Sequence, residues 1–354
     1  MQIILSFIAL LLIAGPTWAE ESKVHFHGYG ELHYNGQNAA TDKIDMHRMV
    51  WGLSYQYNDK ISMHSEIDFE HAAQEMELEF AYLDFNINSA LNVRAGVMLM
   101  PVGPLNEYHE PPLFYSVERP TTQNKVIPTT WQEGGIGIFG SVPAGLKYSL
   151  YVVSGLNAKG FDSGKGIREG RSKISASHSS LNGKTLESAG DDFAVVGRLD
   201  YTGIPGFNVG FSGYNGNADQ GVVANIGVDV TIMEGDLRYR WKGLDVTAVY
   251  AQVDIGNAAQ LSAKKVGEQI TGWYGEVAYR LGHFVPFYRM EEVNTHAAVP
   301  IGVTADPKND LTITTVGLAF YPIPEIAFKA DYQTEEDGTG SDKEFVNVGV
   351  AYMF

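Results

Sequence analysis

The chain has 354 residues, a formal net charge of −17 and no cysteine, and 44% of its residues are hydrophobic. The negative charge argues against nucleic acid as a partner, because a nucleic-acid-binding surface is basic. Without cysteine, disulfides cannot stabilise an exported chain of this size. The 39 glycines and the excess of tyrosine over phenylalanine are typical of β-barrels, which use glycine in turns and tyrosine at membrane interfaces.

Residues 1–19 predict a cleavable secretory signal peptide. Ile3 to Gly15 is an apolar stretch too short to cross a bilayer as a helix, and a small-residue pattern ending at Ala19 follows it. We expect cleavage after Ala19 and export of residues 20–354. No later stretch holds 18 consecutive apolar residues, so we expect no membrane-spanning helix.

From residue 24 onward, hydrophobic and polar residues alternate with a period of two, which is typical of strands with one apolar and one wet face. We identify sixteen such segments: 24–35, 43–57, 60–71, 75–87, 90–99, 134–142, 145–154, 191–201, 206–215, 226–241, 243–255, 268–281, 283–294, 308–321, 324–335 and 343–354. The connections between them alternate between tight turns and longer loops. Outer-membrane barrels show this asymmetry, with short periplasmic turns and long extracellular loops. The sequence therefore predicts an all-β fold, a transmembrane antiparallel β-barrel of 16 strands over residues 20–354.

The physics of lipid also favours a closed barrel. Backbone amides in hydrocarbon must pair within the protein, and strands achieve this only in a closed sheet. At sixteen strands the interior is too wide for the wall side chains to fill, so we expect it to hold water.

Two details of the strands carry further predictions. Gly235 is expected to mark a β-bulge, because Val230 and Ile232 share one parity whereas Leu237 and Tyr239 share the other. Aromatic residues gather near the tight turns and predict a girdle at the periplasmic interface. These residues are Tyr55, Tyr57, Tyr201, Phe207, Trp241, Tyr279, Phe284, Phe320 and Tyr321.

Part of the sequence resembles a known family. The resemblance lies in residues 96–104 (Gly-Val-Met-Leu-Met-Pro-Val-Gly-Pro), 118–120 (Glu-Arg-Pro) and 134–137 (Gly-Gly-Ile-Gly). These motifs, in this order, resemble the phosphate-selective porin O and P family. The resemblance implies a sixteen-stranded homotrimeric barrel whose third loop folds inward and narrows the channel.

Residues 100–133 suit such a constriction loop on physical grounds as well. A 34-residue connection with six prolines is stiff, and long loops without regular structure are usually functional. The charges that it could present to the channel are Glu107, His109, Glu110, Glu118, Arg119 and Lys125. For Arg119 two interpretations stay open, contact with the permeating solute or a link that pins the loop to the barrel wall, since a buried charge needs partners in either case.

Strand parity points charges of both signs into the barrel. The cations are Arg48, Arg94, Arg198, Arg238, Arg240, Arg280, Arg289 and Lys329, and the acids are Glu66, Asp68, Glu70, Asp200, Glu234, Asp236, Glu276, Glu291 and Asp331. Opposed charges across a channel produce a transverse field, as in a general porin. A phosphate-selective channel instead needs rows of uncompensated arginine and lysine, whereas here acids match the cations.

The loop over residues 155–190 is basic and favours anions. It carries Lys159, Lys165, Arg168, Arg171, Lys173 and Lys184 against three acids. Such a loop could concentrate anions at the mouth of the channel. The alternatives are contact with lipopolysaccharide phosphates or simple solvation.

Histidines could in principle form a metal site, but we expect none. His25, His27 and His64 could all face the lumen near Glu66, and imidazole and carboxylate are metal ligands. The first and third strands are not adjacent, however, so polar lining of the lumen is the default interpretation. We expect no cofactor.

The chain is expected to be a porin of the bacterial outer membrane rather than an enzyme. Its sequence holds no Gly-x-Ser-x-Gly elbow, phosphate loop or His-Glu-x-x-His motif. We expect passive diffusion of small hydrophilic solutes or ions, with outer-membrane lipid and lipopolysaccharide as partners. An anion-preferring channel for phosphate or a related oxyanion is the first alternative. The second is a plugged barrel with an adhesive or structural role.

Overall fold

The computed structural model describes residues 23–38, 40–171, 175–177, 190–220 and 227–354, the third range by its backbone alone. The predicted signal peptide, residues 1–19, lies outside the described residues. So do Lys173 and Lys184 of the basic loop.

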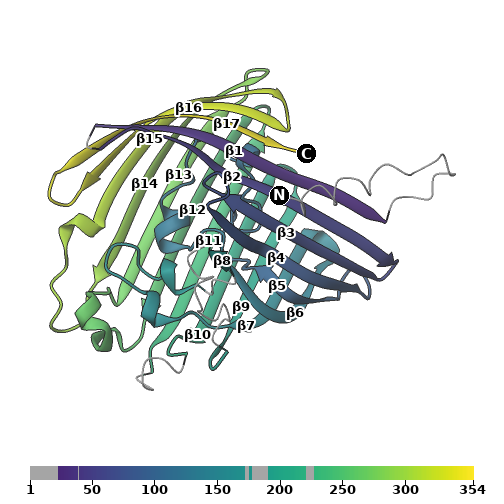
Figure 1. Ribbon diagram of the computed structural model, residues 1–354, viewed down its shortest axis with the longest axis horizontal. Coiled ribbons are helices and arrows are strands. Elements are labelled where there is room, and N and C mark those ends of the chain that lie inside the picture. The colour runs from purple at the N-terminus through teal and green to yellow at the C-terminus, as the bar shows by residue number, and fades with distance from the viewer. Residues whose placement is uncertain (1–22, 39, 172–174, 178–189, 221–226) are drawn as a thin grey trace, which may run out of the picture.

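Seventeen strands form one antiparallel sheet that closes on itself. They are β1 (Val24–Gln37), β2 (Lys43–Asn58), β3 (Ile61–Glu70), β4 (Glu75–Asn86), β5 (Asn92–Leu99), β6 (Gln132–Val142), β7 (Leu146–Ser154), β8 (Ser175–Ser177), β9 (Phe193–Ile204), β10 (Phe207–Asn217), β11 (Asp229–Trp241), β12 (Leu244–Ile255), β13 (Gln269–Tyr279), β14 (Phe284–Ala298), β15 (Asp310–Ile323), β16 (Ile326–Asp337) and β17 (Asp342–Met353). The three-residue β8 belongs to the loop after β7 and pairs with the start of β4. The other sixteen form the barrel, in which sequence neighbours pair and β17 pairs with β1 (Figure 1). The predicted sixteen-stranded barrel is confirmed.

The closure between β1 and β17 is continuous. Its register runs from Tyr29 opposite Met353 to Gln37 opposite Phe345. Beyond it, Gly28 and Phe354 exchange backbone hydrogen bonds of 3.1 and 2.9 Å. No barrel strand therefore has an open edge, which satisfies the amide pairing that lipid demands.

Tight turns and long loops lie at opposite ends of the barrel, which we call the short-turn end and the long-loop end. Two residues separate β2 from β3, β9 from β10, β11 from β12 and β15 from β16, whereas β5 and β6 are separated by residues 100–131. The loops and turns contain short helical turns: η2 (Pro111–Leu113), η3 (Thr122–Val126), η4 (Pro143–Gly145), η5 (Ala158–Gly160), η6 (Arg168–Gly170), η8 (Ala258–Lys264) and η9 (Pro307–Asn309). Among the described residues, no helix has the length and hydropathy needed to cross a membrane.

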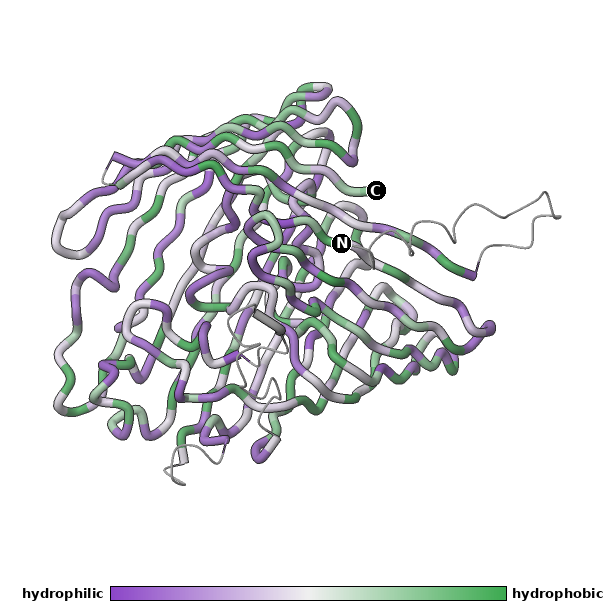
Figure 2. Tube along the Cα trace, viewed as in Figure 1, coloured by the Kyte–Doolittle hydropathy of each residue, from purple (hydrophilic) through white to green (hydrophobic). Residues whose placement is uncertain are grey.

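The outer surface of the barrel is apolar, and polar residues face inward. Hydrophobic and hydrophilic residues alternate along the strands (Figure 2). Phe26 is 60% exposed on the outer face, where its ring lies 6.5 Å from that of Trp51 and 5.7 Å from that of Phe354. Tyr321 departs from the predicted girdle. It is 5% exposed, and its hydroxyl donates to the Pro112 carbonyl at 3.1 Å, inside the barrel.

The bulge predicted at Gly235 is wrong. The register of β11 with both neighbouring strands is continuous through this position. Val230 and Ile232 are buried on the same inward face as Glu234 and Asp236. The inward face of β11 thus changes from apolar to charged along one uninterrupted strand, because loops pack against its apolar half.

Those loops fill part of the interior that the strand number alone predicts to be water. A buried cluster joins Met100, Ile127 and Trp131 to wall residues such as Val153 and Val253. The wall of a wide barrel leaves such space, and folded-in loops occupy some of it. The remaining cross-section of the lumen is left for water.

Candidate functional site

The chain between β5 and β6, residues 100–131, lies inside the barrel (Figure 1). Its helical turns touch the wall, η2 at β17 and η3 at β13 and β14. Asn106 joins the two ends of this loop. Its amide group donates to the carbonyls of Met100 and Trp131 at 2.8 and 2.9 Å and accepts from the Trp131 N–H at 2.9 Å.

The middle of the loop, residues 111–118, is here called the loop tip. Lys329 of β16 holds one side of it, with its ammonium donating to the carbonyls of Pro111 at 2.5 Å and Ser116 at 2.9 Å. The same ammonium lies 3.9 Å from the centre of the Phe114 ring. Hydrogen bonds from the ammonium to carbonyl oxygens and its contact with an aromatic face both stabilise a buried cation at this position.

The opposite side of the loop tip is attached to other strands. Tyr115 donates to the carboxylate of Asp245 on β12 at 2.7 Å. Arg289 on β14 donates to the Ser116 hydroxyl at 2.6 Å. The loop tip is therefore attached to β12, β14 and β16, which belong to one continuous arc of the barrel wall.

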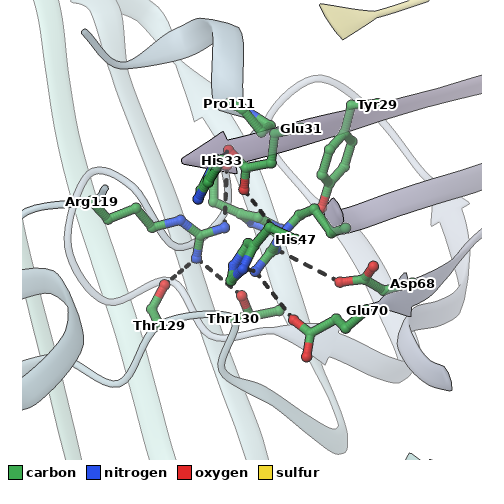
Figure 3. A network of polar contacts seen from close by, with 12 residues as sticks. Tyr29, Glu31, His33, His47, Asp68, Glu70, Pro111, Arg119, Thr129 and Thr130 are labelled. Carbon is green, nitrogen blue, oxygen red and sulfur yellow. Dashed lines mark hydrogen bonds and ion pairs between the residues drawn. The ribbon is translucent and has the colours of Figure 1, made fainter. Parts of the chain in front are cut away.

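The predicted lumen charge Arg48 is surrounded by acids. Its guanidinium lies 3.3 Å from Glu70, 3.4 Å from Glu31, 3.7 Å from Asp68 and 3.9 Å from Glu79. Figure 3 shows several of these carboxylates converging from neighbouring strands. Arg48 is only 4% exposed, so its charge is compensated where it is buried.

Five of the other seven predicted wall cations have acids as ion-pair partners, whereas Arg280 and Lys329 have none among the described residues. Arg94 holds Asp84 with two hydrogen bonds of 2.8 and 2.9 Å. The remaining ion pairs are Arg198 with Asp200, Glu234 and Asp236, Arg238 and Arg240 with Asp245, and Arg289 with Glu276 and Glu291. Arg280 lies just beyond β13, where its guanidinium is 5.1 Å from the centre of the Tyr321 ring. Most of the wall cations are thus in direct ion pairs with individual acids, in line with the expected balance of charge.

Three of the six predicted loop charges line a cavity at the long-loop end: Glu118, Arg119 and Lys125. Its volume is about 720 Å³, and we call it the outer cavity. Glu118 accepts from Asn35 at 3.0 Å and lies 3.2 Å from His33 Nδ1. Burial would raise the Glu118 pKa, but the contact with His33 outweighs it and lowers the pKa below the usual range.

Arg119 makes its hydrogen bonds to neutral oxygens of its own loop. Its guanidinium donates to the hydroxyls of Thr129 and Thr130 (Figure 3). It also donates to the His109 carbonyl at 3.3 Å. Burial and the charge of Arg48 lower the pKa of Arg119 to about 10, so it is still charged at neutral pH. These contacts lie within the loop and do not pin it to the barrel wall. Contact of Arg119 with the permeating solute stays a prediction.

The other three predicted loop charges lie around a smaller cavity of about 130 Å³. Glu107, His109 and Glu110 share its lining with Arg94 and Glu66. Burial raises the pKa of Glu107.

His109 belongs to a buried network. Its Nε2 contacts Glu79 and lies 2.8 Å from the Tyr29 hydroxyl, and its Nδ1 donates to the Asn106 carbonyl at 2.8 Å. With 2% of its surface exposed, it fixes the loop to β1 and β4.

The basic loop reaches the outer cavity. Lys165, Arg168 and Arg171 line it together with Lys125, whereas Lys159 is exposed. Arg168 donates to the Asn124 side chain, and Arg171 donates to the carbonyls of Thr129 and Thr130. Burial lowers the pKa of Lys125, Arg168 and Arg171. In the described part of the chain, none of these three has a carboxylate within ion-pair distance.

The outer cavity therefore brings opposite charges together from different parts of the fold. The acids Glu31, Glu70, Glu75 and Glu77 come from the wall strands β1, β3 and β4. Apart from Arg48 of β2, the cations come from the two loops. A second cavity of about 730 Å³ lies at the short-turn end, lined by Arg238, Arg240, Arg280 and His283. The loop tip borders both cavities.

The N-terminal histidines are brought closer than strand adjacency suggests. His27 Nε2 and Glu66 Oε1 are 2.9 Å apart although β2 lies between them. Gly52 of β2 faces both residues, and a Cβ there would collide with the His27 ring. His64 is bound to Ser54 and Ser62 at 2.9 and 3.0 Å.

Several residues of the site have no sequence signal that we identified. Asn106 is one loop asparagine among several, and Glu79 is one of a run of acids in β4. Asp245 follows a tight turn, yet it accepts from two arginines and a tyrosine. Parity places Glu31 and His33 on the same face of β1 as His27, which was expected to face the lumen.

Comparison with known proteins extends these observations. No family model matches the chain. An uncharacterized protein of Aquifex aeolicus (strain VF5) is 31% identical over 369 residues, covering 96% of this chain and 82% of that protein.

Three solved structures show the same fold at low identity. Salmonella typhi OmpF has a TM-score of 0.62 at 13% identity, covering 94% of this chain and 97% of OmpF. The outer membrane channel DcaP of Acinetobacter baumannii has a TM-score of 0.61 at 10% identity, covering 97% and 100%. The trimer form of OmpT, an outer membrane protein of Vibrio cholerae, has a TM-score of 0.56 at 12% identity, covering 94% and 99%.

Proposed function

The chain belongs to the same family as the Aquifex aeolicus protein and has the fold of outer-membrane porins, and we propose that it is a bacterial outer-membrane porin. Small hydrophilic solutes and ions would diffuse through it passively. The supporting observation is a closed barrel with an apolar exterior and a charged interior that holds cavities of about 720 and 730 Å³ at its two ends. No chemical step is involved, because size and field alone select what passes.

The loop tip is the proposed selective element. It borders both cavities and is attached to three wall strands, so a solute that moves from one cavity to the other must pass it. In this proposal residues 100–131 form the constriction, and the paired wall charges supply a transverse field.

Preference for anions is a second candidate, and a specific observation favours it. Most wall cations are matched by acids, but Arg119, Lys125, Arg168 and Arg171 of the outer cavity make no ion pair among the described residues. Burial lowers the pKa of each of the four. An anion could supply that compensation, and phosphate is the anion suggested by the resemblance to the O and P family.

Current recordings in planar bilayers test the proposal. Stepwise conductance from the purified protein, absent from detergent alone, is expected. Barrels that insert without any conductance would favour the plugged, adhesive alternative and overturn the porin. The sign of the reversal potential in a KCl gradient then separates anion from cation preference, and block of chloride current by phosphate tests the oxyanion.

A charge-removal pair isolates the outer cavity. Arg168→Gln with Arg171→Gln is expected to move the reversal potential toward cation preference. Lys308→Gln on an exposed loop is the matched control and should leave it unchanged. Equal reversal potentials in all three proteins would remove the anion candidate while leaving the porin intact.

The partners follow from the same proposal. Lipid would cover the apolar exterior, and the basic loop lies at the end where lipopolysaccharide phosphates are found. A homotrimer is proposed from the resemblance and from the trimeric OmpT structure. Chemical crosslinking in mild detergent, read as the size of the largest specific product, tests it.

A further inference from the structure

We propose that Asp45, His47 and His71 form a binding site for a divalent transition-metal ion, of the Zn²⁺ class, at the wall of the outer cavity. The three residues come from β2 and from the turn after β3. Two imidazoles and one carboxylate suit ions of borderline softness, whereas Ca²⁺ and Mg²⁺ prefer oxygen ligands throughout.

The backbone brings these three side chains together. Asp45 and His47 both lie in β2, where the register with β1 shifts at His47, and this irregularity places the His47 ring 3.5 Å from the Asp45 carboxylate. The N–H of His71 donates to the His47 carbonyl at 3.1 Å, which places the turn beside β2. His71, Ala72 and Ala73 all have positive φ angles of 50°, 56° and 67°, so a left-handed turn sets where the His71 side chain lies.

The ligand atoms are already close to one another. Asp45 Oδ2 lies 2.7 Å from His71 Nδ1 and 3.5 Å from His47 Nδ1. One ligand atom from each residue lies within 4.8 Å of the others. Tetrahedral ligands at zinc distances are separated by about 3.3 Å, so small side-chain rotations would accommodate an ion. All three side chains are partly exposed, which leaves an entry path and room for water as a further ligand.

Carboxylates outnumber cations around the site. Glu70, Glu75 and Glu77 line the same cavity, whereas one cation, the Arg48 guanidinium, lies 3.4 Å from His47 Nε2. His33 stacks on His47 with the ring centres 4.9 Å apart and the planes at 11°. His33 is itself held by Glu31 at 2.8 Å, so the His47 ring packs against a fixed neighbour. Such outer contacts orient a ligating imidazole.

A bound ion would also change the channel, and this consequence rests on the proposed function. Two positive charges would be added to the wall that carries the acids of the outer cavity. The field between that wall and the basic loops would weaken, and the mouth would become more favourable to anions. Transition metals outside the cell would then regulate what enters.

The binding test uses the full-length protein in detergent, without a histidine tag and after dialysis against a chelator. Titration with Co²⁺ is expected to give visible d–d absorption that saturates at one ion per chain and that Zn²⁺ abolishes. His71→Ala and Asp45→Asn should each weaken binding by more than about 100-fold, beyond the 10–100-fold typical of outer contacts. His25→Ala, at the short-turn end, is the matched control and should bind as the wild type does. Heat-dependent migration on gels verifies that each variant is folded.

Three results would overturn the site: no saturable Co²⁺ binding, equal binding by wild type and both ligand variants, or displacement of Co²⁺ by equal concentrations of Ca²⁺. The last would assign binding to the acidic residues instead. In bilayers, Zn²⁺ at the long-loop side should move the reversal potential toward chloride in the wild type and not in His71→Ala. If the protein forms no channel, the porin fails while the Co²⁺ titration still decides the site.

Discussion

Replacing Lys329 by methionine should loosen the loop tip. Methionine keeps an unbranched apolar side chain, one atom shorter, but removes the ammonium that donates to Pro111 and Ser116. A hydrogen bond from a charged group contributes about 1.5–3 kcal/mol, so the two together contribute about 3–6 kcal/mol. Part of this loss in free energy is offset, because removing the buried charge also removes its desolvation cost. We expect a net loss of about 3 kcal/mol, which raises the ratio of released to attached loop about 150-fold.

Single-channel recording measures this release. The Lys329→Met channel should switch between conductance levels far more often than the wild type, because the loop tip borders both cavities. Its thermal unfolding in detergent should stay close to that of the wild type, since all sixteen barrel strands keep their pairing. Lys308→Met removes a charge from an exposed loop and serves as the control. A Lys329→Met trace as quiet as the wild type would refute the view that this ammonium holds the constriction.

Three further outcomes follow from the contacts described above. Asn106→Ala removes three hydrogen bonds and leaves the Trp131 N–H without a partner, whereas the Met100 and Trp131 carbonyls each keep a backbone donor. The free energy of unfolding in urea, followed by tryptophan fluorescence, should fall by about 3 kcal/mol. Gly52→Ala should separate His27 from Glu66 and lower the free energy of unfolding by about 1–3 kcal/mol. An unchanged free energy of unfolding would mean that the His27 ring moves aside without cost. Glu118→Gln should lower stability at neutral pH and make no difference at strongly acidic pH. A carboxyl whose pKa is lowered by folding stabilises the protein above its unfolded pKa, and that contribution disappears as the pH falls through the folded value.

The barrel could be predicted from the sequence because its physical cause is local. Alternation within a strand such as β3 and the regular difference in loop length are visible without tertiary contacts. The bulge at Gly235 was a wrong prediction because the rule behind it assumes that only the outer face is apolar. β11 is apolar on its inward side where loops cover it, and no local pattern reveals which strands a loop will cover.

The site was predictable by residue type but not by pairing. Parity placed Arg48 and its acids in the lumen, yet Glu79 and Glu31 joined them from strands whose order around the barrel had to be known. The same limit applies to His27 and Glu66, which meet only because the strand between them contributes Gly52. The missing side chain of Gly52 permits a contact between strands that are not neighbours, and reading one strand at a time does not detect this.

The pairing of β1 with β17 imposes an order on assembly. Asn35 and Asn347, which are 312 residues apart, hydrogen-bond across this seam, so it forms only after β17 has been synthesised. Every shorter nascent chain would be an open sheet with two unpaired edges, and such edges invite aggregation. The polypeptide must therefore be kept unfolded during its passage across the inner membrane and the periplasm, and insertion must be a late, concerted event.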